Sequence, residues 1–275
     1  MTLLLTACAG GKGMDDPTFQ TLFDKGRAYL ERDNVAMALP ALQQANQLQP
    51  GHVELLTLLG VAYDRAGRPV QALDALEEAH RLQPADGNLN NDLGVARLRL
   101  YAASCAHGEE TECQTLLDQA EVSFQAALQD PALHLPEDVW FNLALLYKQR
   151  AQERAMVTAL EKALAISSHH LPAQLELAEY AHQKGYLDLE RQLLRRALAT
   201  YPDHLVVLKR LVNSFLGTPA QDAPSSAAGV TRLSPDLSPG ERAEVRSFLV
   251  RILAVAPETD AAQRASQQIL LLDGK

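Results

Sequence analysis

Three glycines recur at a fixed interval in the first third of the chain. Gly26, Gly60 and Gly94 are separated by 34 residues each. The segments around the first two also match each other in register, at Leu22/Leu56, Tyr29/Tyr63, Ala38/Ala72, Leu42/Leu76, Ala45/Ala79 and Pro50/Pro84. A period of this length is typical of proteins in which each copy forms one small unit and neighbouring copies stack. The chain is therefore expected to fold as stacked copies rather than around one central core.

Each period contains the pattern of two helices. Leu56, Leu59 and Tyr63 recur at intervals of three and four residues, which predicts a helix with one buried face. The small residues of the period, such as Gly60 and Ala72, let two helices approach closely. Glycine and proline then separate the helices within and between copies. The sequence thus predicts antiparallel helical hairpins.

The combined pattern, Leu56-x2-Leu59-Gly60-x2-Tyr63…Ala72-x3-Leu76-x2-Ala79…Pro84, resembles the tetratricopeptide repeat (TPR) family. Weaker copies follow, and the only tryptophan, Trp140, falls where the family favours one. The resemblance implies an all-α fold, a TPR superhelix (α–α solenoid) of about five to six helical hairpins with a C-terminal capping helix. The expected repeats lie near residues 19–52, 53–86, 87–136, 137–170 and 171–204, with the first helix of a sixth at 205–217.

The expected organisation has four parts. Residues 1–16 are a signal remnant and tether, 17–217 the solenoid, 218–240 a flexible loop rich in Ser, Pro and Ala, and 241–275 the C-terminal helices that complete and cap the stack. Ser238-Pro239-Gly240-Glu241 has the form of a helix-capping box. The second helix of repeat three begins 14 residues late, which is expected to lengthen both of its helices by about two turns around a tip near Ser104–Glu112.

Composition argues against several functions. The net charge is −9 and no basic stripe is present, so nucleic-acid binding is not expected. No stretch approaches the roughly 20 apolar residues of a membrane span. No phosphate loop, nucleophile elbow or dinucleotide-binding glycine pattern occurs. The adjacent His169 and His170 are interpreted as solvated turn residues, and Cys105, His107 and Cys113 lack a fourth zinc ligand. A non-catalytic protein without cofactor or metal is expected.

The amino terminus contains Leu5-Thr6-Ala7-Cys8, which resembles the lipobox of bacterial lipoproteins. This resemblance implies lipidation of Cys8, with the glycine-rich stretch after it as a tether and Ala9 favouring the outer membrane. A secretory signal also needs a basic region and a longer apolar run, and neither precedes Cys8. Either the start lies further upstream or the match is fortuitous. Removing Cys8 leaves Cys105 and Cys113, which could form a disulfide in an oxidising compartment or remain as two thiols in the cytosol.

In TPR proteins the first helix of each hairpin lines a concave groove. The corresponding positions imply a partner-binding groove at Phe23, Arg27, Thr57, Val61, Asn91, Val95, Phe141, Leu145, Leu175 and Glu179. Most of them are apolar, unlike the basic set with which chaperone adaptors bind a peptide carboxylate. The groove is therefore expected either to accept an apolar segment of another protein or to be covered by parts of this chain.

The run from Gln129 to Glu179, together with the lipobox, resembles the TPR lipoproteins of bacterial type IV pilus biogenesis, which help the secretin assemble. The resemblance implies a scaffold anchored in the outer membrane by lipid and facing the periplasm, with a secretin subunit as its protein partner. Two alternatives stay open. One is another envelope TPR lipoprotein, serving the Tad pilus, peptidoglycan or secretion machinery. The other is a soluble cytoplasmic TPR adaptor.

Overall fold

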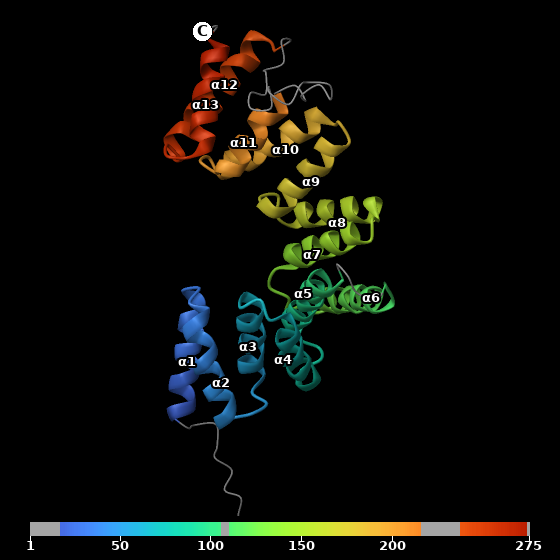
Figure 1. The fold of residues 1–275 in the computed structure, drawn as a ribbon. Helices are drawn as coiled ribbons and strands as arrows, with labels where there is room; N and C mark the ends of the chain where they lie inside the picture. Colours follow the sequence, from blue (N-terminus) through green and yellow to red (C-terminus); the bar gives the residue numbers. More distant parts are fainter. Residues whose placement is uncertain (1–16, 106–109, 216–236, 274–275) are drawn as a thin grey trace, which may run out of the picture. The chain divides into compact units, whose positions relative to one another are not determined.

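A computed structural model of the chain describes residues 17–105, 110–215 and 237–273. Thirteen helices, and no strand, occur within these ranges (Figure 1). Their bounds are α1 Pro17–Glu31, α2 Val35–Leu48, α3 Val53–Arg65, α4 Pro69–Leu82, α5 Gly87–Ser104, α6 Glu110–Ala127, α7 Pro136–Gln149, α8 Glu153–Ile166, α9 Leu171–Gln183, α10 Leu187–Thr200, α11 Leu205–Phe215, α12 Pro239–Val255 and α13 Asp260–Leu272. The expected all-α fold class is confirmed.

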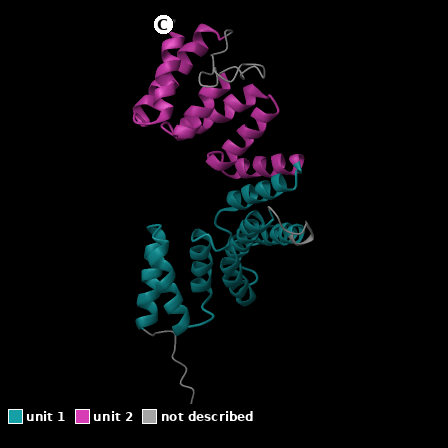
Figure 2. Cartoon of the chain, in the orientation of Figure 1, with its two compact units in different colours: residues 1–152 teal, residues 153–275 magenta. Residues whose placement is uncertain are grey.

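The chain divides into two compact units, residues 1–152 and 153–275 (Figure 2). In the first unit α1 packs on α2, α3 on α4 and α5 on α6, as the antiparallel hairpins require. The first helices of these hairpins also contact one another, because α3 packs against both α1 and α5, and α5 against α7. These four helices therefore form one continuous row within the first unit. In the second unit α9 packs on α10, α11 on α12, and α12 on α13.

The periodic glycines are contacted by side chains of the second helix in each hairpin. A Cβ added at Gly26, Gly60 or Gly94 would lie only 2.4–2.5 Å from an atom of Leu42, Leu76 or Phe124, respectively. Alanine occupies the equivalent positions of the fourth and fifth repeats, where Ala144 and Ala178 are buried. The sequence interpretation attributed the small residues to the approach of two backbones. The nearest neighbours are instead large side chains that lie directly over the glycine.

Four helices begin with a side-chain cap at the same point of the repeat. The Nδ1 atoms of His52, His170 and His204 accept the backbone N–H three residues ahead at 3.2, 3.1 and 3.4 Å, and Asp86 does the same with an oxygen at 3.0 Å. Such caps satisfy an N–H that has no partner within the helix. His170 follows a turn and is half-buried, and it caps α9, a role that the interpretation as a solvated turn residue did not include. The Nδ1 atom of its neighbour His169 lies 3.0 Å from Thr200 Oγ1.

The late second helix of repeat three is explained by two long helices. α5 and α6 each have 18 residues, whereas the other helices of the first unit have 13 to 15. At 3.6 residues per turn the extension relative to α3 is about one and a half turns at most, not two. Cys105, the C-cap residue that follows α5, and Cys113, in α6, form a disulfide with a Cα–Cα distance of 5.7 Å. The predicted tip includes residues 106–109, which lie outside the described ranges, as does most of the predicted loop 218–240.

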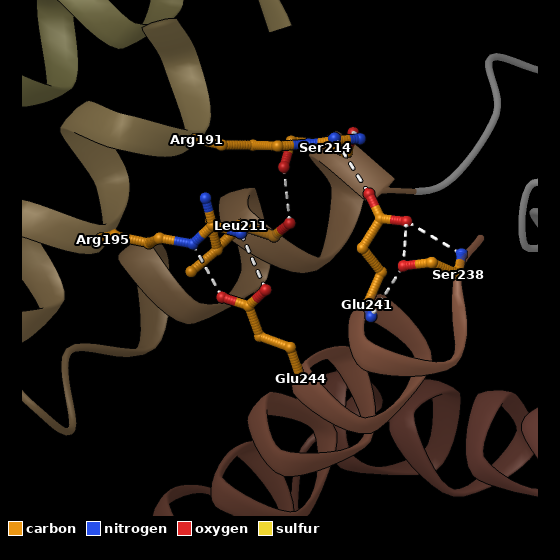
Figure 3. A network of polar contacts seen from close by, with 7 residues as sticks. All are labelled: Arg191, Arg195, Leu211, Ser214, Ser238, Glu241 and Glu244. Carbon is orange, nitrogen blue, oxygen red and sulfur yellow. Dashed lines mark hydrogen bonds and ion pairs between the residues drawn. The ribbon is translucent and has the colours of Figure 1, made fainter. Parts of the chain in front are cut away.

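Polar contacts attach α12 to the helices before it. Ser238 and Glu241 form the expected capping box at its start. Arg195 of α10 donates hydrogen bonds from Nε and Nη2 to the two carboxylate oxygens of Glu244, both at 2.7 Å (Figure 3). Arg191 lies 3.6 Å from Glu241 and donates to the carbonyl of Ser214 at 2.8 Å. This network fixes α12 beside α11, although the residues that join the two helices lie outside the described ranges.

Candidate partner-binding groove

Three hollows follow one another along α5 in the first unit. The acidic hollow, of about 510 Å³, lies between the starts of α3 and α5 and includes Glu54, Thr57, Asp86, Asn88 and Asp92 among its lining residues. The middle hollow, of about 140 Å³, includes Val61, Asp64, Arg65, Asp92 and Val95. The apolar hollow, of about 350 Å³, lies between α5 and α7 and is lined by Val95, Leu98, Arg99, Tyr101, Ala102, Asn142, Leu145 and Gln149.

Shared residues join these hollows into one groove. Asp92 lines both the acidic and the middle hollow, and Val95 lines both the middle and the apolar hollow. With Asn88, Arg99 and Ala102 they follow one face of α5 at intervals of three and four residues. One helix face is thus the floor of a continuous groove, and α3 and α7 are its flanks.

The extension of α5 builds much of the apolar hollow. Tyr101 and Ala102 belong to the last turn of α5, which the shorter first helices of the other repeats lack. Three residues of α7, Asn142, Leu145 and Gln149, line the same hollow. The disulfide at Cys105 ties this last turn to α6. The insertion in repeat three therefore contributes directly to the candidate site.

Asp92 is the most perturbed acid of the groove. Burial, together with the nearby charge of Asp86, raises the pKa of Asp92 to about 6, while a hydrogen bond with Asn91 acts in the opposite direction. At neutral pH the carboxylate is therefore mostly ionised in a site that disfavours its charge. Sequence reasoning missed Asp92, although its place on one face with Val95 could have indicated it.

Most of the residues predicted for the groove in this unit are half-buried on the row of first helices. Thr57, Val61, Val95 and Leu145 line the three hollows. Asn91 accepts a hydrogen bond from Asn142 at 3.0 Å and so links α5 to α7. Phe141 is half-buried in α7 and does not line these hollows. Sequence reasoning missed Leu98, Tyr101, Ala102, Asn142 and Gln149.

Phe23 is the clear exception and corrects the prediction. Only 3% of it is exposed, and its ring lies 5.7 Å from that of Phe19 and 5.3 Å from that of His52, between ring centroids. Arg27 covers the same ring at 4.6 Å and forms an ion pair with Glu54 at 2.5 Å. Phe23 therefore belongs to the core of the first hairpins and not to an open apolar stripe.

In the second unit an arginine contacts both of the residues predicted for the groove, Leu175 and Glu179. Arg210 of α11 donates to the carbonyl of Leu175 at 3.0 Å and lies 3.2 Å from the carboxylate of Glu179. Both predicted residues are therefore engaged within the unit. We accordingly place the candidate site in the first unit, on α3, α5 and α7.

The remaining predicted features fall partly outside the described residues. Cys8 lies outside the described residues. Within the described ranges no three His, Cys, Asp or Glu side chains gather as a metal site, and none of the helices there is long and apolar enough to cross a membrane.

The repeats themselves define the class of protein. The sequence profile of the tetratricopeptide repeat matches residues 23–87 and again residues 137–170. The chain thus contains tetratricopeptide repeats, whose stacked hairpins serve as scaffolds for protein–protein interaction. Over 118 residues, or 42% of this chain, it is 32% identical to the peroxisomal targeting signal receptor of Pichia angusta. The chain spans only 20% of the length of that receptor.

Two solved structures are similar along nearly their whole length. PilW, described as a widely conserved type IV pilus biogenesis factor, has a TM-score of 0.64 and 14% identity, with 90% of this chain and 98% of PilW covered. PilF of Pseudomonas aeruginosa has a TM-score of 0.62 and 17% identity, with 92% and 98% covered. At these identities the likeness concerns the fold, and it agrees with the resemblance to pilus biogenesis proteins seen in the sequence.

Proposed function

We propose that this protein is an outer-membrane lipoprotein that faces the periplasm and assists assembly of a type IV pilus secretin. The observation that carries the proposal is the similarity of fold to PilW along 90% of this chain and 98% of that one. The lipobox at Cys8 supplies the anchor, and the disulfide between Cys105 and Cys113 suits an oxidising compartment.

The groove supplies the mechanism. An apolar segment of an immature secretin subunit lies along α5 and places a side chain between Leu145 and Tyr101. Covering such a segment keeps it from aggregating before the subunit reaches its place in the membrane. The scaffold needs no chemistry for this role, since binding and release are sufficient.

Complementation of a deletion strain tests the proposal. The strain is expected to lose secretin multimers, and the wild-type gene with its full upstream region is expected to restore them. Cys8→Ser should release the protein from membranes, and Leu145→Glu should abolish rescue because it places a charge in the apolar hollow. Leu189→Glu is the matched control, because Leu189 lies exposed on α10.

Normal secretin multimers in the deletion strain would refute the role in secretin assembly. Rescue by Leu145→Glu, in a variant whose circular dichroism stays helical, would show that the groove is not the binding site. Unchanged membrane fractionation of Cys8→Ser would refute the lipid anchor.

A soluble adaptor is the second candidate. The 32% identity to a peroxisomal targeting signal receptor favours it, because that protein is named for recognising a targeting signal. Recovery of the native protein in the soluble cytoplasmic fraction, with its cysteines reduced, would support the adaptor over the lipoprotein.

A further inference from the structure

The charges of the acidic hollow are all negative. Glu54, Asp86 and Asp92 line it, and no Lys or Arg does. All three carboxylates have a hydrogen-bonding partner within the fold. Glu54 pairs with Arg27 at 2.5 Å, and Asp86 accepts the N–H of Leu89 at 3.0 Å as a helix cap.

The partner of Asp92 is the uncharged side chain of Asn91. Among the ion pairs that the described part of the chain forms, none includes Asp92. The basic residues of the neighbouring hollows are already paired, since Arg65 lies 3.3 Å from Asp33 and Arg99 lies 3.6 Å from Asp64. The groove thus presents, at Asp92, a half-buried carboxylate whose charge no Lys or Arg of the described residues neutralises.

The distance between Asp92 and the apolar hollow follows from the rise of α5, on which both lie. The apolar hollow is centred between Val95 and Ala102, six or seven residues beyond Asp92. At a rise of 1.5 Å per residue this separation is about 10 Å along the helix. A polyproline-type segment brings side chains i and i+3 to one side at about 9 Å, and a helix does so for i and i+7 at about 10 Å.

We infer that the partner segment is basic as well as apolar: a Lys or Arg side chain enters the acidic hollow and pairs with Asp92, while an apolar side chain about 10 Å away fills the apolar hollow. The inference rests on the proposed function, because it specifies the segment that the groove holds. Charge complementarity at Asp92 selects the segment, and apolar contact at Leu145 supplies most of the buried area.

Selection from a displayed library of random 12-residue peptides tests this inference. The full chain is the bait, and enriched peptides are synthesised with a fluorescent label and titrated by anisotropy. Enriched sequences are expected to contain Lys or Arg three or seven positions from an apolar residue. Asp92→Asn is expected to weaken the binding of such a peptide at least tenfold. The exposed Glu78→Gln, which removes the same charge from α4 outside the groove, is expected to change it less than twofold.

A double-mutant cycle separates the ion pair from other effects. Replacing the peptide lysine by norleucine should make its affinity insensitive to Asp92→Asn. Peptides without a basic residue, or affinity unchanged in Asp92→Asn, would overturn this inference. If Leu145→Glu still abolishes binding of those peptides, the groove remains the binding site. Enrichment of no peptide, or binding unaffected by Leu145→Glu, would overturn the groove and this inference together.

Discussion

The contact between Gly94 and Phe124 yields a quantitative prediction about the repeat. A Cβ at Gly94 would lie 2.5 Å from Phe124 Cε1 and 2.8 Å from Cδ1 and Cζ, and the Phe124 ring is fully buried. Overpacking of this kind costs about 1–3 kcal/mol, whereas exchanging Gly for Ala inside a helix gains about 1 kcal/mol. Gly94→Ala is therefore expected to lower the free energy of unfolding by up to about 2 kcal/mol.

A second substitution should remove the clash. Phe124→Leu alone is expected to destabilise by about 1–2 kcal/mol through loss of buried apolar area. The double variant recreates the alanine–leucine pairs of the later repeats, such as Ala178 with the buried Leu194. Its destabilisation should therefore be smaller than the sum of the single effects by about 1–3 kcal/mol.

Urea denaturation followed by circular dichroism measures all three variants. Gly240→Ala is the matched control, because an added Cβ there meets nothing within 4 Å, and it should be neutral or slightly stabilising. If the single effects of Gly94→Ala and Phe124→Leu add within about 0.5 kcal/mol, the two positions are independent and the packing argument fails.

Three further predictions concern single positions. Asp92→Asn is expected to raise the free energy of unfolding by up to about 3 kcal/mol above pH 6, and to lose this gain below pH 4, because the raised pKa means that ionising the wild-type carboxyl costs more in the fold than in the unfolded chain; equal gains in urea melts at pH 4 and pH 8 would contradict this. His170→Ala should cost about 0.5–2 kcal/mol by removing the cap on Ala173 N–H, and His170→Asn should restore most of it in the same melts. Ala151→Gly should raise the melting temperature, since Ala151 has φ of +55° where Gly67 and Gly185 stand in other repeats, and a lower value would refute that reading.

The predicted stability of Asp92→Asn also bears on function. The same substitution is expected to stabilise the fold at neutral pH and to weaken peptide binding. Loss of binding could then not be attributed to unfolding. A destabilised charge retained in a binding groove is typical of sites where stability and function oppose each other.

Much of the helical organisation could be predicted from neighbours in the sequence. The hairpins around Gly26 and Gly60, the capping box at Ser238 and the final helix at Asp260–Leu272 all depend on residues within a few positions of one another. A helix stripe, a cap or a turn is a local arrangement, so the pattern of residue types is enough to indicate it.

The exposure of the groove residues required the tertiary structure. Phe23 and Thr57 occupy equivalent repeat positions, 34 residues apart, yet Phe23 is buried against Phe19 and His52, while Thr57 lines a hollow. Asp92 and Tyr101 line the groove because α3 and α7, which are distant in sequence, pack beside α5. The sequence by itself thus determined where helices form and how they pair. Which of their side chains remain open to a partner was decided by packing between elements, because the burial of a side chain depends on neighbours that no local pattern specifies.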